Sequence, residues 1–177
     1  MAKEITKKHI IDCFNALSRK YSIDNITVNM IVAEAGVSKS TFYRLFLDKY
    51  DVMNYNYKLV LDEIFEKTKF KSWGELFINI LSFVEKDFKR VKNAFLSEGI
   101  NSYEKFVFDY SFNRMNEKFF EKHGRYMGKN EIYSAKIVIY GCVNTVRDWL
   151  FDGRPISKVE LAQQIDRTIP EEYQILC

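Results

Sequence analysis

Proline and glycine are scarce in this chain of 177 residues, which contains two Pro and seven Gly. An all-β protein needs a turn after each short strand, and most turns use Gly, Pro, Asn or Asp. So few turn-forming residues argue against a β-sheet protein. Hydrophobic residues make up 47% of the chain and supply ample material for a core. The composition therefore predicts an all-α protein.

Residues that carry chemistry are also few. The three cysteines lack CxxC spacing, and an odd number of this kind is typical of free thiols in a reducing compartment. His9 and His123 lie far apart without HExxH or similar spacing, and there is no glycine-rich phosphate loop or GxSxG turn. We therefore expect no enzyme activity, no metal site and no cofactor.

Long hydrophobic runs are missing too. No stretch approaches 18 uninterrupted apolar residues, so no transmembrane helix is expected. The first residues, MAKEITKKHIIDCF, lack the apolar run of a signal peptide. These absences predict a cytoplasmic protein without a membrane partner.

The basic charge is unevenly placed. The net charge is +3, and Lys and Arg exceed Asp and Glu by this same amount within residues 1–50, so the rest of the chain is balanced. A local basic surplus indicates which end to inspect for a polyanionic partner.

The first fifty residues carry the signals of three helices. An amphipathic pattern covers Thr6–Tyr21, and Thr27 is a good N-cap for a second helix. Gly36 suits the left-handed position that ends this helix, and Ser38 can cap a third helix almost at once. Two short helices joined by AGVS form a helix-turn-helix.

The third helix separates apolar from polar side chains. At about 100° per residue, Phe42 and Phe46 share one side, which predicts that they are core. Ser40, Tyr43 and Arg44 face the other side, with Lys39 and Thr41 on the flanks. A helix capped by Asp48 is expected from Lys49 to about Lys69. Further helices are expected at about Gly74–Lys89, Val91–Leu96, Ser102–Lys122, Glu131–Phe151 and Ser157–Thr168.

The segment Ile26–Val52, ITVNMIVAEAGVSKSTFYRLFLDKYDV, resembles the DNA-binding segment of the TetR (tetracycline repressor-like) family of transcriptional regulators. Val32, Tyr50 and Val52 depart from the family's usual small residue, acid and leucine. The stretch IYGCVNTVRDWLFDGRPISKVELAQQI resembles the long penultimate helix and capped last helix of many members.

The resemblance implies an all-α homodimer of about nine helices per chain. Residues 1–48 would form a three-helix DNA-binding domain and residues 49–177 a larger effector-binding and dimerisation domain. The implied function is a ligand-responsive repressor that binds a pseudo-palindromic double-stranded operator as a dimer and is released by a small-molecule effector. One alternative is an activator of the same fold. Another is a helical adaptor that keeps the helix-turn-helix only as a packing unit.

The resemblance also assigns roles at the DNA interface. Thr41, Tyr43 and Lys49 match phosphate-contacting positions. Lys39 and Ser40 are the candidates for base edges, and Arg44 could reach either guanine or phosphate. The alternative for these side chains is a solvated helix face with a cap. The full set of expected DNA-binding residues is Thr27, Ser38, Lys39, Ser40, Thr41, Tyr43, Arg44 and Lys49.

The middle of the chain is rich in aromatic residues, most of which must be core. A pocket among these helices would be lined by aromatic rings and suit a hydrophobic or planar effector. The candidates for its polar contacts are Tyr110, Arg114, Asn144 and Arg147, for which an ordinary surface role is the alternative. Gly141 indicates a close helix crossing or room for a ligand, because an interior glycine weakens a helix.

The last two predicted helices present a broad apolar stripe. Too much apolar surface lies there for one chain to cover, so we expect a two-fold dimer built from both helices. The stripe consists of Ile132, Ala135, Ile139, Val143, Val146 and Leu150, with Leu161 and Ile165 on the last helix.

Overall fold

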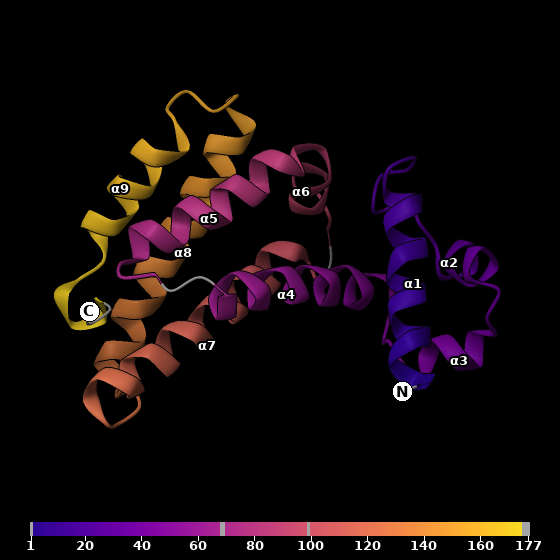
Figure 1. Cartoon of the computed structure of the whole chain (residues 1–177), viewed down its shortest axis with the longest axis horizontal. Helices are drawn as coiled ribbons and strands as arrows, with labels where there is room; N and C mark the ends of the chain where they lie inside the picture. Colours follow the sequence, from indigo (N-terminus) through magenta and orange to yellow (C-terminus); the bar gives the residue numbers. More distant parts are fainter. Residues whose placement is uncertain (1, 68–69, 99, 175–177) are drawn as a thin grey trace. The chain divides into compact units, whose positions relative to one another are not determined.

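The structure, a computed structural model, describes residues 2–67, 70–98 and 100–174 (Figure 1). These residues form helices and no strand, which confirms the all-α prediction. The elements are α1 (Ala2–Ser18), α2 (Val28–Ala35), α3 (Lys39–Tyr43), α4 (Lys49–Lys67), α5 (Trp73–Lys86), α6 (Phe88–Phe95), α7 (Tyr103–His123), α8 (Lys129–Phe151), α9 (Lys158–Thr168) and the short 3-10 helix η1 (Glu171–Tyr173).

Every expected helix is present, and the boundaries that differ most are those of α1, which begins at Ala2 rather than Thr6, and those between α5 and α6. α1 ends at Ser18 rather than Tyr21, because the N–H groups of Lys20 and Tyr21 turn back to the Leu17 carbonyl. α5 ends at Lys86 rather than Lys89, and α6 begins at Phe88 rather than Val91, with Asp87 between them. The expected end of α4 at Lys69 lies outside the described residues.

Contacts divide the chain into two compact units. The first comprises Met1–Val60 and Lys89–Tyr103, and the second comprises Leu61–Phe88 and Glu104–Cys177. Both units therefore draw on α4 and α6. The division predicted between residues 48 and 49 separates functions rather than packing units, and it stays a prediction.

The core of the first unit joins α1, α2 and α3. Ile10, Ile31 and Phe42 are fully buried, so one apolar side chain from each helix reaches the centre. On the α1 side, the imidazole Nε2 of His9 lies 3.2 Å from the carbonyl of Ala35, at the end of α2. These contacts hold three short helices that would not be stable alone.

In the second unit, α5 and α9 pack side by side and antiparallel (Figure 1). At one end the Gly74 N–H donates to Asp166 at 2.9 Å, and at the other Lys158 pairs with Glu85 at 2.9 Å. A Cβ at position 74 would lie 3.2 Å from the Asp166 side chain, so glycine permits this close approach. Farther along the chain, the backbone carbonyl of Tyr173 accepts a hydrogen bond from the indole N–H of Trp73 at 2.8 Å.

The stripe predicted as the dimer face is the core of the second unit instead. Its members on α8 from Ala135 to Leu150 are at most 8% exposed within a single chain, and Ile132 is half-buried. Leu161 and Ile165 on α9 are each 3% exposed. The expectation that one chain could not cover these residues was wrong for these members, because other residues of the same chain already bury them.

No helix within the described ranges is long and apolar enough to cross a membrane.

Candidate nucleic-acid interface

The turn between α2 and α3 has the expected geometry. The hydroxyl of Thr27 accepts the Met30 N–H at 3.2 Å and so caps α2. Gly36 adopts φ 59° and ψ 32°, a left-handed conformation that glycine takes without strain. The Val37 N–H then reaches back to the Val32 carbonyl at 3.1 Å, which closes the helix end.

α3 has one buried face and one exposed face. Phe42 is fully buried and Phe46 is 2% exposed, which confirms them as core. Tyr43 is 56% exposed, and its ring stands edge-on to that of Phe42 at a centroid distance of 5.4 Å. Ser38 caps the helix by accepting the Thr41 N–H at 3.0 Å, while its own hydroxyl donates to Thr41 Oγ1 at 3.0 Å.

The structure brings the predicted DNA-binding residues of the turn and α3 together on the exposed side of the first unit. Thr41 is half-buried, and its hydroxyl accepts a hydrogen bond from Ser38. Arg44 ends the helix and its side chain is exposed. The exposed members are Thr27, Ser38, Lys39, Ser40, Tyr43 and Arg44. This face offers hydroxyl, ammonium and guanidinium groups, the donors that suit phosphate and base edges.

Lys49 is placed differently from the other predicted contacts. Its half-buried ammonium donates to the carbonyls of Ile23, at 2.9 Å, and Asp24, at 2.7 Å. Burial lowers its pKa, while the nearby Asp24 and Asp48 carboxylates act in the opposite direction. An ammonium has three donors, so one remains for a phosphate. Lys49 therefore ties the α1–α2 loop to the start of α4, whatever it contributes to DNA binding.

Tyr50 strengthens the same attachment and was missed as a structural contact. Its hydroxyl donates to Asp24 Oδ1 at 3.0 Å, and burial, followed by this hydrogen bond, raises its pKa to about 12. The sequence marked Tyr50 only as a departure from an acid. Asp24 supplies an acid from the loop, a pairing that no local pattern could have revealed.

Two more residues beside α3 escaped the sequence analysis. Leu47 directly follows the motif's Phe46 and is 77% exposed. Lys7 places its ammonium 3.4 Å from the centroid of the Tyr55 ring and so joins α1 to α4 by a cation–π contact. The only available signal for Lys7 was the basic surplus of residues 1–50.

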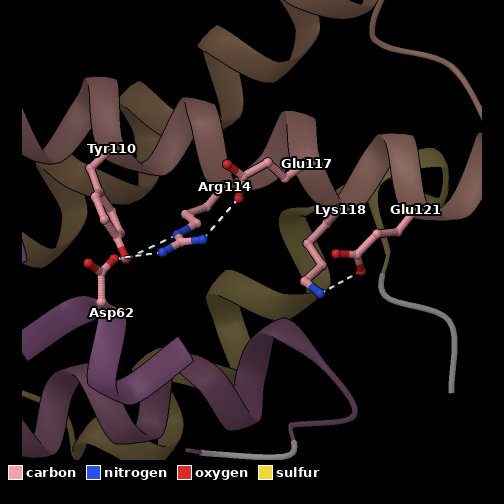
Figure 2. Close-up of polar contacts among 6 residues, drawn as sticks. All are labelled: Asp62, Tyr110, Arg114, Glu117, Lys118 and Glu121. Atoms are coloured by element: carbon pink, nitrogen blue, oxygen red, sulfur yellow. Dashed lines mark hydrogen bonds and ion pairs between the residues drawn. The ribbon is translucent and has the colours of Figure 1, made fainter. Parts of the chain in front are cut away.

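Two of the four effector candidates meet in the second unit (Figure 2). The Tyr110 hydroxyl donates to Asp62 Oδ1 at 2.9 Å, and Arg114 donates to the same oxygen at 2.6 Å. Arg114 Nε also donates to the Tyr110 hydroxyl at 3.1 Å, and Nη1 pairs with Glu117 at 3.0 Å. Burial raises the pKa of Tyr110, so its hydroxyl stays protonated at neutral pH. Asp62, Tyr110 and Arg114 thus form a polar network between α4 and α7.

The other two candidates lie on α8 and do not join this network through any described hydrogen bond or ion pair. Asn144 donates to the Tyr140 carbonyl of its own helix at 2.9 Å. The Arg147 guanidinium lies 5.2 Å from the Phe151 ring centroid, and its buried Nε has no acceptor among the described residues. Nearby, burial raises the pKa of the Cys142 thiol to about 11, which keeps it protonated and favours a packing role.

Two segments of the chain match models of known protein families. Residues 15–55 match the family described as bacterial regulatory proteins, tetR family. Residues 71–171, more than half of the chain, match a transcriptional regulator C-terminal region of the same family. The chain has the fold and the exposed helix-turn-helix of a DNA-binding transcriptional regulator, a class without enzyme activity. It belongs to the TetR family of bacterial transcriptional regulators.

A similar solved structure is described as dihydroxyacetone kinase operon activator DhaS. The two chains are 17% identical, and their match covers 91% of this chain and 92% of the other. They superpose with a TM-score of 0.61. At that identity the likeness shows the fold alone. A comparison with curated proteins found no match.

Proposed function

We propose that this TetR family regulator is a cytoplasmic repressor that binds a pseudo-palindromic operator as a homodimer and releases it when a small-molecule effector binds. In this proposal residues 1–48 read the DNA and residues 49–177 bind the effector and dimerise. The observation that carries the proposal is the exposed polar face of α3 over the fully buried Phe42.

The contact roles follow from the position of each side chain. Lys39 and Ser40 occupy the first turn of α3 and reach base edges, while Tyr43 and Thr27 contact phosphates. Arg44 reaches guanine or phosphate from the end of the helix. One helix this short buries too little surface to hold a specific site, so two copies act together on successive major grooves.

The dimer contact that we propose uses the outer face of α8, with α9 beside it. Tyr133, Ile137 and Tyr140 are 62%, 73% and 54% exposed, and they recur at helical spacing. Gly141 continues this face, and among the described residues no atom outside its own helix backbone and chain neighbours lies within 4 Å of a Cβ built there. In this proposal a second copy of α8 supplies the close crossing expected at Gly141, which leaves room for a ligand as the alternative.

The effector site that we propose lies in the second unit beside the network of Asp62, Tyr110 and Arg114. An anionic or hydrogen-bonding group on the effector could replace Asp62 as the partner of Arg114 and so release α4 from α7. The orphaned Nε of Arg147 supports a further contact from α8, near Asn144.

The effector mechanism makes a testable prediction. Asp62→Asn should cost about 1.5–3 kcal/mol of stability, because it weakens two hydrogen bonds to charged or buried partners. Glu117→Gln is the control, because Glu117 is 55% exposed and its pair with Arg114 is worth about 0–1 kcal/mol. Chemical denaturation measures both. Equal, small losses would show that the network does not hold α4 to α7.

The function itself is tested by selecting bound fragments of the source genome and measuring their affinity across a salt series. A regulator gives a steep fall in affinity with salt, because binding releases counterions from phosphates. No duplex binding at low salt would leave the helical adaptor as the better interpretation. A reporter gene behind the selected operator then separates repression from activation.

A further inference from the structure

The first unit contains a hollow of about 520 Å³ that none of the proposed DNA or effector contacts uses. It lies between the end of α1 with the loop that follows and the beginning of α6. Its lining residues are Ser18, Arg19, Lys20, Tyr21, Ser22, Lys89, Arg90 and Asn93. The volume lies within the range of about 300–1,000 Å³ that small-molecule sites occupy.

The lining of the hollow is positively charged. Arg19 and Lys20 approach from the loop after α1, while Lys89 and Arg90 approach from α6, and the lining contains no carboxylate. Arg19, Lys20 and Lys89 are exposed and form no ion pair within the described residues. Like charges gathered around a concave surface raise the local potential, and a multivalent anion bound there relieves their repulsion.

The beginning of α6 adds to this potential. Lys89 and Arg90 lie in the first turn of this helix of eight residues, which contains no acidic residue in that turn. The N-terminal end of a helix carries a partial positive charge and normally favours Asp or Glu. Two cations there are unfavourable for the isolated helix. Asp87 directly precedes the helix, outside the lining of the hollow, and an anion in the hollow would meet the Lys89 and Arg90 side chains themselves.

Neutral groups complete the lining. Tyr21 is 46% exposed at the hollow and offers an aromatic face. The Asn93 amide bridges the two walls, because its Nδ2 donates to the Tyr21 carbonyl at 3.4 Å and its Oδ1 accepts the Ile23 N–H at 3.4 Å. The two walls, 70 residues apart in sequence, are thus already joined beside the cations.

We propose that this hollow binds a small molecule that carries two or more linked phosphates. The phosphates lie among Arg19, Lys20, Lys89 and Arg90, and the Tyr21 ring stacks on an aromatic group of the ligand where one is present. Concavity favours a compact ligand over a DNA backbone, which lies along an open surface. The ligand adds a second link between the α1–α2 loop and α6, and this loop supplies the carbonyls that hold Lys49.

The test uses the full chain and isothermal titration calorimetry with tripolyphosphate and, separately, with adenosine triphosphate. Arg19→Gln with Lys89→Gln removes one cation from each wall. The matched control is Lys3→Gln with Lys8→Gln, which removes the same charge from exposed positions of α1 outside the hollow. Because each phosphate contact is charge-assisted, we expect the hollow variant to lose about tenfold or more in affinity for tripolyphosphate. The control should change by no more than about threefold, since screening limits distant charges.

Several outcomes overturn the proposal. The wild-type chain could fail to bind tripolyphosphate at millimolar concentration. The hollow variant and the control could also lose equal affinity for tripolyphosphate. A labelled DNA duplex provides another: if the hollow variant loses as much affinity for the duplex as for tripolyphosphate, the hollow is a DNA contact.

Two further variants complete the experiment. Lys20→Gln with Lys89→Gln repeats the measurement should the first pair unfold, and its affinity loss is expected to be the same. Tyr21→Leu separates the sources of the phosphates. If the natural ligand is a nucleotide, the Tyr21→Leu variant loses affinity for adenosine triphosphate but not for tripolyphosphate. If the natural ligand is a simple polyphosphate, the variant binds both molecules as the wild-type chain does.

Discussion

α3 and α8 both present two faces, yet only α3 reveals from its sequence which face is inside. On α3 the apolar Phe42 is buried, and the opposite face carries polar residues such as Ser40 and Arg44. On α8 both faces carry large apolar residues: Ile139 is 3% exposed and Ile137 is 73% exposed. A helical apolar pattern identifies the buried side only when the other side is polar.

This difference explains why one prediction was confirmed and the other was wrong. The core role of Phe42 and Phe46 followed from local spacing alone. On α8 the more regular stripe predicts the dimer face, but most of it is buried within a single chain. The large apolar residues of α8 that stay exposed are Tyr133, Ile137 and Tyr140, which the sequence analysis did not select. Four experiments test this difference and the contacts around it.

The largest expected effect is that of Phe42→Ala, which should destabilise the first unit by about 3–5 kcal/mol, because it leaves a cavity beneath α3. DNA binding should be lost. Both tryptophans, Trp73 and Trp149, lie in the second unit, so tryptophan fluorescence reports its unfolding separately from total helicity. We expect denaturant to unfold the first unit earlier while the fluorescence transition stays unchanged. A fluorescence transition that shifts equally would show that the two units unfold as one.

The second experiment tests the outer face of α8. Ile137→Arg should weaken the dimer by about 2–4 kcal/mol, the range of residues central to an interface. Sedimentation velocity over a concentration series measures the change. The control is Ile100→Arg, because Ile100 is 88% exposed and lies in the first unit. A dimer that withstands Ile137→Arg would place the contact elsewhere.

The third experiment separates the two roles of Lys49. Lys49→Ala should lower affinity for all duplexes and reduce the salt slope by about one unit if the ammonium contacts a phosphate. Tyr50→Phe removes the neighbouring hydrogen bond to Asp24 without changing charge, and should leave the salt slope unchanged. If Lys49→Ala behaves like Tyr50→Phe, the lysine acts only by holding the α1–α2 loop.

The smallest effects are expected at the first turn of α3. Lys39→Ala should change the preferred base at one operator position by about 1–3 kcal/mol, with a smaller change for Ser40→Ala. Competition among operator variants in a binding assay measures the preference. A uniform loss across all variants would reassign these residues to phosphate contacts.

The sequence alone determined the features that depend on neighbouring residues. Few breakers and regular apolar spacing predict the helices, and Thr27, Gly36 and Ser38 specify the ends of α2 and α3 through their own hydrogen bonds and backbone freedom. The polar face of α3 and the family resemblance followed from the same short segment. These features are local, so a pattern of adjacent residues is enough to predict them.

The tertiary structure alone decided which apolar face of α8 is covered, where the Lys49 ammonium lies and how Asp62 meets Tyr110 and Arg114. It also brought Arg19 and Lys20 to Lys89 and Arg90 around one hollow. Each of these arrangements joins segments far apart in the chain. Their geometry depends on how whole helices pack to exclude water, and spacing along a single helix carries no information about its neighbours.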